Sequence, residues 1–136
     1  MAMNHGITTM DPRNRAVGMG AGAFIERHIF PHGELPHLSF ALRAMSDQGL
    51  EAIDVESLRH HYAKTLAFWA VRLEAARDRA CALVGERRYR TWLVYLAGCA
   101  HAFERGWISL HQILAVKAQR SGMSPVPWTR AHLYKN

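Results

Sequence analysis

The sequence predicts an α/β fold that is rich in helices and contains only a few strands. Apolar residues recur at the spacing of an amphipathic helix over residues 62–80 and again over 92–103. Residues 50–55 alternate apolar and polar side chains, as a half-buried strand does, and residues 107–117 are expected to form another strand. With 136 residues, 49% of them hydrophobic, the chain can bury a sizeable core. So few strands for so many helices are expected of a piece cut from a larger sheet.

The first third of the chain is expected to hold short elements separated by loops. Residues 5–9 (HGITT) can end a strand, and a polar, glycine-rich loop follows at 11–22. Residues 23–29 can form a short helix. A further helix is expected over 36–48, because it begins with a proline, whose missing N–H is unpaired in a first turn anyway. Gly49 is suited to cap its C-terminal end.

Two long helices are expected in the second half of the chain. The first presents one apolar face and is closed by Gly85; its face carries Tyr62, Leu66, Trp69, Leu73, Ala76 and Ala80. The second covers 86–105 and ends at Gly106, with a stripe of Trp92, Tyr95, Leu96, Cys99 and Phe103. We assign residues 1–117 to one domain and 118–136 to a basic tail that is expected to be loosely held.

The charge and cysteine content restrict the partners and the compartment. The formal net charge is +6, from 17 Lys and Arg against 11 Asp and Glu, which favours anionic partners such as nucleic acid or anionic lipid. Two cysteines without metal-ligand spacing indicate a reducing compartment. The first 15 residues do not resemble a signal peptide, and no apolar run approaches the roughly 20 residues of a membrane span. We expect a cytoplasmic protein, at most peripheral to the inner face of the membrane.

A glycine motif at residues 18–22 (GMGAG) matches a nucleotide-binding loop only in its spacing. Such a loop follows a buried strand and opens a helix, and an acidic residue for the ribose lies about 20 positions later. Residues 10–17 do not have the composition of a buried strand, and no second apolar strand ends in an acid at the right distance. We therefore expect no nucleotide cofactor at this motif.

Metal and nucleic-acid sites are also disfavoured. The nine histidines are scattered, with His60 and His61 adjacent so that their side chains diverge, and zinc ligands are spaced more tightly. The arginine-rich segments 72–79 and 86–90 contain acids, as solvated helix faces do. The aromatic residues fall on the predicted buried faces and not among the basic residues, where they would stack on bases.

Three segments resemble one family in sequence, order and spacing. They are residues 24–36 (FIERHIFPHGELP), residues 55–69 (VESLRHHYAKTLAFW), and residues 95–103 (YLAGCAHAF) followed by 106–112 (GWISLHQ). They are similar to segments of cyclopropane fatty acid synthases and mycolic acid cyclopropane synthases, and the resemblance covers roughly residues 5–117. It implies the C-terminal portion of a class I (Rossmann-like) methyltransferase fold, with the last few strands of the sheet.

The resemblance also implies a reaction. In that family S-adenosylmethionine gives its methyl group to a cis double bond of an unsaturated acyl chain. The resulting carbocation loses a proton to close a cyclopropane ring, although some members stop at a methyl branch. A bicarbonate ion in the site is thought to act as the base. For this chain the implied partners are unsaturated phospholipid acyl chains and a peripheral membrane surface, and not nucleic acid.

Individual residues match the family's functional positions. His5 and Ile7 fall where the family contributes to the bicarbonate pocket, and Tyr62 matches a tyrosine whose hydroxyl faces that anion. The resemblance thus implies catalytic roles for Tyr62 and His5, since a phenol and an imidazole can donate hydrogen bonds to a small anion. The positions that match the acyl channel are Phe30, Leu35, Leu66, Tyr95, Cys99 and Phe103. For Leu66 and Phe103, plain core packing is an equal alternative.

The chain also departs from the family. The cofactor loop, the acidic ribose contact, and the cysteine and glutamate of the bicarbonate site lie upstream in relatives and have no counterpart here. We therefore expect that this chain alone does not bind S-adenosylmethionine, and that an N-terminal methyltransferase half is a partner that completes any activity. The missing strands would leave a sheet edge and an apolar face exposed.

Two other functions stay open. The chain can be a non-catalytic lipid-binding or interaction module, which would bind acyl chains or liposomes without a cofactor. It can also be a small basic nucleic-acid-binding protein, whose binding would weaken steeply with salt. Whether the lone chain is an enzyme is left undecided by the sequence.

Overall fold

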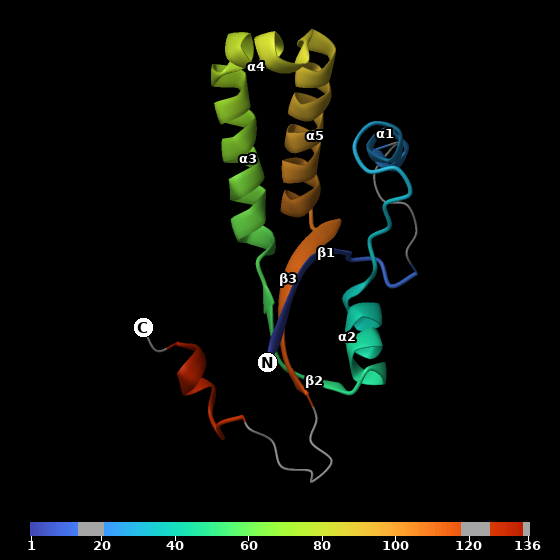
Figure 1. Ribbon diagram of the computed structural model, residues 1–136, viewed down its shortest axis with the longest axis vertical. Helices are drawn as coiled ribbons and strands as arrows, with labels where there is room; N and C mark the ends of the chain where they lie inside the picture. Colours follow the sequence, from blue (N-terminus) through green and yellow to red (C-terminus); the bar gives the residue numbers. More distant parts are fainter. Residues whose placement is uncertain (14–20, 118–125, 135–136) are drawn as a thin grey trace.

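The computed structural model describes residues 1–13, 21–117 and 126–134, which form a three-stranded sheet with helices around it (Figure 1). The strands are β1 (Ala2–Thr9), β2 (Leu50–Ser57) and β3 (Ile108–Lys117), in the order β1-β3-β2. β3 is antiparallel to both neighbours, so that β1 and β2 run in the same direction. The strands expected from the sequence are confirmed, and β1 begins three residues before the HGITT segment.

The two faces of the sheet differ in their side chains. Ile7 and Leu110 are paired across β1 and β3, and both belong to the apolar core on one face. On the other face the buried side chains of Thr8 and His111 are hydrogen-bonded, with 3.0 Å between Oγ1 and Nδ1. Burial, and to a lesser extent the nearby His37, lowers the pKa of His111, so that its imidazole is neutral at neutral pH. This polar pair fixes the register of β1 on β3.

Two short helices connect β1 to β2. α1 (Ala21–His28) and α2 (Leu38–Asp47) confirm the helices expected over 23–29 and 36–48, with shifted ends. α2 starts two residues after Pro36, because His37 is its N-cap and its imidazole accepts a hydrogen bond from the Ser39 N–H. Gly49, with φ of 70°, reverses the chain after the helix, and α2 packs against β2.

A helical hairpin connects β2 to β3. α3 (Arg59–Ala75) and α5 (Glu86–Glu104) lie side by side and extend away from one end of the sheet, and α4 (Arg77–Val84) crosses their far end (Figure 1). The single helix that was expected up to Gly85 is therefore wrong, since the chain breaks at Ala76 (φ −99°, ψ 20°). The apolar stripe ends in alanines here, too small to hold a longer helix on α5, and Asp78 favours a new helix start.

The core lies where the hairpin meets the sheet. Its buried members are Leu66, Leu96, Cys99, Phe103 and Leu110. Arg59 fixes this junction, because its Nη1 donates to the carbonyl oxygens of Phe103 (2.7 Å) and Glu104 (3.1 Å) at the end of α5. Gly106, with φ of 70°, then turns the chain into β3, as the sequence predicted.

Part of the C-terminal tail contacts the sheet. A 3₁₀ helix, η1 (Arg130–Leu133), lies beside β2, and the Arg130 guanidinium forms an ion pair with Asp54. Residues 118–125 of the tail lie outside the described residues. No helix in the described part of the chain has the length and apolar content that crossing a bilayer requires.

The corner between α4 and α5 is organised by the carboxylate of Glu86. It accepts hydrogen bonds from Cys81 Sγ (3.0 Å) and Arg90 Nε (2.8 Å), and Arg77 Nη2 lies 3.3 Å away. These three donors, the Cys81 thiol first, lower the pKa of Glu86 to about 2. The carboxylate is therefore charged over the whole neutral and mildly acidic range.

We expect Glu86→Gln to lower Tm by about 1–3 °C at pH 7, since exposed ion pairs stabilise proteins only slightly. The folded-state pKa of Glu86 lies below its ordinary value of 4.5, so the stabilisation is present above about pH 4.5 and is lost as the pH falls towards 2. Thermal unfolding of both proteins from pH 7 to pH 2.5 checks this. The two Tm values should converge in acid, and a constant difference would contradict this role of Glu86.

Candidate functional site

The candidate site lies between α3 and α5, next to the sheet. Tyr62 on α3 faces Phe103 on α5, with 5.1 Å between the ring centroids in an edge-to-face arrangement. Leu66, one turn after Tyr62, is buried in the same cluster. The i,i+4 spacing of the sequence therefore brings these side chains together as expected.

Tyr95 and Cys99 continue the site along α5. Burial, followed by the neighbouring Cys99 thiol and Tyr62 phenol, raises the pKa of Tyr95 well above its ordinary value. Burial also raises the pKa of Cys99, and a hydrogen bond with Tyr95 offsets this only in part. Both groups are neutral at physiological pH. The site thus presents aromatic and sulfur surfaces with no anionic nucleophile from these two residues, a lining compatible with a short-lived cation.

Phe30 and Leu35 are not buried in this cluster. Both belong to the segment between α1 and α2, and they are 52% and 38% exposed. The ring of Phe30 meets the ring of Tyr95 edge-on, at 6.0 Å between centroids. The ring of Trp92 also meets the ring of Tyr95 edge-on, with 5.5 Å between the ring centroids, and Trp92 is 41% exposed. The predicted acyl-lining residues therefore run from an exposed end at Phe30 to a buried end at Phe103.

β1 contributes Ile7 and His5. The Ile7 side chain packs against the same core cluster as Tyr62. His5 points to the same face two residues earlier, but it is exposed, and its Nδ1 lies 3.1 Å from Gln112 Nε2. Ile7 and Tyr62 therefore pack against the same core cluster, whereas His5 is exposed.

The backbone of β1 adds hydrogen-bond donors at the open edge of the sheet. The Thr9 N–H points away from β3 and donates to the Pro36 carbonyl oxygen at 3.1 Å. Because N–H directions alternate along an antiparallel strand, the N–H groups of Ile7 and His5 also point to this edge. Outward N–H groups at an open sheet edge can donate hydrogen bonds to a small anion.

Most of the glycine motif, for which no nucleotide cofactor is expected, lies where the structure gives no description. Gly18–Gly20 lie outside the described residues, while Ala21 and Gly22 open α1. Eight residues separate the end of β1 from Gly18, whereas a dinucleotide loop follows its strand directly. In the described part of the chain, no group of three or more His, Cys, Asp or Glu is arranged to hold a metal ion.

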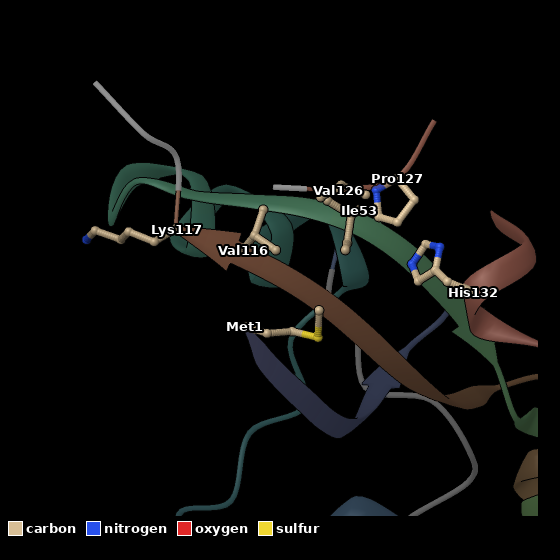
Figure 2. Close-up of a pocket in the computed structure, with 7 residues that line it drawn as sticks. All are labelled: Met1, Ile53, Val116, Lys117, Val126, Pro127 and His132. Carbon is tan, nitrogen blue, oxygen red and sulfur yellow. The ribbon is translucent and has the colours of Figure 1, made fainter. Parts of the chain in front are cut away.

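Sequence reasoning missed a cavity of about 380 Å³ at the other end of the sheet (Figure 2). Its walls come from four separate parts of the chain, and it is lined by Met1, Ile53, Val116, Lys117, Val126, Pro127 and His132. The tail closes one side of it, held by the Arg130–Asp54 ion pair. No sequence pattern connects these residues, because the cavity exists only when the tail lies beside β2.

Comparison of the sequence with models of protein families identifies the family of this chain. The family described as mycolic acid cyclopropane synthetase matches residues 1–113. The chain belongs to this family. The match includes every residue of the candidate site.

Individual relatives agree with that family. A probable fatty acid methyltransferase of Pseudomonas putida is 56% identical over 135 residues, which are 99% of this chain and 34% of the relative. Cyclopropane mycolic acid synthase 1 of Mycobacterium tuberculosis is 39% identical over 94 residues, which are 69% of this chain and 33% of the relative. The chain thus spans about a third of the length of these two family members.

Solved structures of the family share the fold. The mycolic acid cyclopropane synthase CmaA1, complexed with SAH and CTAB, aligns with a TM-score of 0.75 and 35% identity. The cyclopropane synthase MmaA2 from Mycobacterium tuberculosis aligns with a TM-score of 0.77 and 28% identity. Each alignment covers 83% of this chain and 42% of the other. The five helices and three-stranded sheet of the described residues therefore correspond to part of a family methyltransferase structure.

Proposed function

We propose that this chain is the C-terminal, acyl-binding part of a cyclopropane-fatty-acyl-phospholipid synthase, in which a class I methyltransferase fold is completed by another part. The relatives have about two thirds of their length outside the matched segment, and we place the S-adenosylmethionine site there. The observation that carries the proposal is the meeting of Tyr62, Tyr95, Cys99 and Phe103 between α3 and α5, beside Ile7. Membership of the family gives this cluster its chemical meaning.

In this proposal, residues of the hairpin bind the unsaturated acyl chain. Phe30 and Leu35 guide it at the entrance, and Leu66, Tyr95, Cys99 and Phe103 surround it further in. Apolar walls exclude water, which would otherwise react with a cationic carbon. The ring faces of Tyr62 and Phe103 can stabilise positive charge near the double bond. Bound S-adenosylmethionine supplies the methyl group.

Tyr62, Ile7 and His5 would hold bicarbonate. The Tyr62 hydroxyl and the outward backbone N–H groups of β1 are donors, and His5 at the rim can add its imidazole. Donors that are fixed before the reaction position an anion without a reorganisation cost. An anion held there would lie beside the acyl site, where it can accept a proton from the acyl chain.

Acyl binding can be tested on the chain as it is. Trp69 and Trp92 are in ring contact with Tyr62 and Tyr95, so their fluorescence reports on occupation of the site. We expect a cis-unsaturated fatty acid, titrated below its micelle concentration, to change this fluorescence saturably. The absence of a saturable change in the folded chain would contradict the proposal. Acyl binding without any methyl transfer after reconstitution would instead favour a non-catalytic lipid-binding module.

Cys99→Trp is expected to weaken acyl binding at least about tenfold. An indole at Cys99 would occupy the place beside Tyr95 that the proposal gives to the acyl chain. Ala97→Trp, on an exposed position of α5, is the matched control and should bind normally. Circular dichroism confirms that both variants fold. Normal binding of long acyl chains by Cys99→Trp would show that Cys99 is only a core residue.

A further inference from the structure

The helical hairpin ends in an apolar corner at its far end from the sheet. Leu83 and Val84, the last residues of α4, are 75% and 46% exposed. Gly85, with φ of 79°, then turns the chain into α5, and no atom lies within 4 Å of the place where its Cβ would be. Figure 1 shows α4 as the element furthest from the sheet along the long axis. The corner therefore projects aliphatic side chains into solvent.

Arginines surround this corner. Residues 72–90 contain six arginines and three carboxylates. Arg79 lies one helical turn before Leu83, and Arg87 and Arg88 lie in the first turn of α5. Glu86 engages Arg77 and Arg90, whereas these other three arginines form no ion pair with any residue in the described ranges.

The position of Arg87 and Arg88 is unfavourable for the helix itself. The N-terminal end of a helix carries partial positive charge, so that cations in the first turn are destabilising there. The same two residues are exposed and do not contribute to the core. Their placement is therefore better explained by an external anion than by the stability of α5.

A groove beside the corner is also lined by both arginines and apolar side chains. It has a volume of about 520 Å³, lies between α1 and α5, and is lined by Phe24, Glu86, Arg87, Arg90, Thr91 and Val94. Guanidinium groups next to apolar side chains match a phosphate group that is attached to a hydrocarbon body. Val94 in its lining directly precedes Tyr95 on α5.

We propose that the corner of α4 and α5 is a docking surface for a bilayer of anionic phospholipid. Leu83 and Val84 enter the interface, while Arg79, Arg87 and Arg88 contact lipid phosphates. Short apolar insertion combined with a basic cluster is how peripheral proteins bind anionic membranes. A nucleic-acid surface would need aromatic residues among the arginines for stacking, and the exposed apolar residues of the corner are aliphatic. Docking here would place the entrance at Phe30 and Tyr95 on the side of α5 that the groove follows.

Vesicle sedimentation of the 136-residue chain tests this surface. We expect binding to vesicles of phosphatidylglycerol and phosphatidylcholine, and at least about tenfold weaker binding to pure phosphatidylcholine. Arg87→Glu/Arg88→Glu should weaken binding to the anionic vesicles at least about tenfold, and Leu83→Asn should weaken it severalfold. Raising the salt concentration should weaken binding as well.

Two matched controls separate this surface from general effects. Arg43→Glu/Lys64→Glu changes the net charge equally at exposed positions of α2 and α3, and Phe40→Asn removes a 56% exposed apolar side chain from α2. Both should bind like the unaltered chain.

Absence of binding to anionic vesicles, or an equal loss in the controls, would overturn the proposal. Binding to duplex DNA in place of vesicles, abolished by the Arg87 and Arg88 changes, would assign the surface to nucleic acid. Vesicle binding requires neither acyl entry nor methyl transfer, so its outcome is independent of the proposed function.

Discussion

Phe103→Ala is expected to destabilise the chain by about 3–5 kcal/mol, as is usual when a buried phenylalanine is truncated. Phe103 has no exposed surface and packs on Tyr62 at the junction of α3, α5 and the sheet. Removing the ring leaves a cavity that Leu66 and Leu110 cannot fill without moving the hairpin. Because folded domains are stable by only about 5–15 kcal/mol, the variant should lose a large part of its stability.

Urea unfolding followed by circular dichroism measures this effect. The midpoint should fall strongly while the slope of the transition stays the same, which indicates a change in stability and not in the folded compactness. Phe40→Ala is the control, because Phe40 is 56% exposed on α2, and it should change stability by less than about 1 kcal/mol. A similarly small effect of Phe103→Ala would show that the hairpin does not depend on this junction.

Tyr62→Phe is expected to lower methyl-transfer turnover roughly 100-fold in an enzyme reconstituted with a cofactor-binding part, which is the scale of losing one fixed donor to a reacting anion. Acyl binding should change by less than about twofold, because phenylalanine keeps the ring that packs on Phe103. Turnover and acyl affinity are measured separately, by product formation and by the fluorescence titration. This separation distinguishes a role of the hydroxyl in the reaction from a role of the ring in packing.

Tyr134→Phe is the matched control for this substitution. Tyr134 is 73% exposed and lies after η1, and the loss of its hydroxyl should leave turnover unchanged. Unaltered turnover in Tyr62→Phe would remove Tyr62 from the reaction and leave it as a core residue. A parallel loss of turnover and of acyl affinity would indicate that the hydroxyl only maintains the shape of the site.

Much of the fold follows from local sequence signals. The 3.6-residue period placed the interior of α5, and glycines with positive φ after α2, α4 and α5 mark three chain reversals. The break at Ala76 escaped prediction because alanine favours a continuous helix, whereas the packing of α4 across α5 is a tertiary contact that local propensity does not show. The antiparallel order β1-β3-β2 also depends on long-range pairing that no local period reveals.

The candidate site was predictable to a similar extent. Helical spacing correctly placed Tyr62 and Leu66 on one face of α3, and Tyr95 and Cys99 on one face of α5. That these two faces pack against each other is known only from the fold. The family resemblance named Phe30 as an acyl-channel residue, but only the structure shows that its ring is half exposed and meets the ring of Tyr95 edge-on. The cavity beside the tail had no sequence signal, because its walls combine Met1, residues of β2 and β3, and residues of the tail.

Transfer of labelled methyl from S-adenosylmethionine to unsaturated phospholipid tests whether this chain is the acyl-binding part of a methyltransferase. The assay compares this chain alone, a polypeptide comprising the part of the Pseudomonas putida relative outside the match, and the two mixed with bicarbonate present. We expect product in the mixture and none with either component alone. Product formed by this chain alone, or no product from a mixture in which both components are folded and associated, would contradict the assignment of this chain as the acyl-binding part of the enzyme.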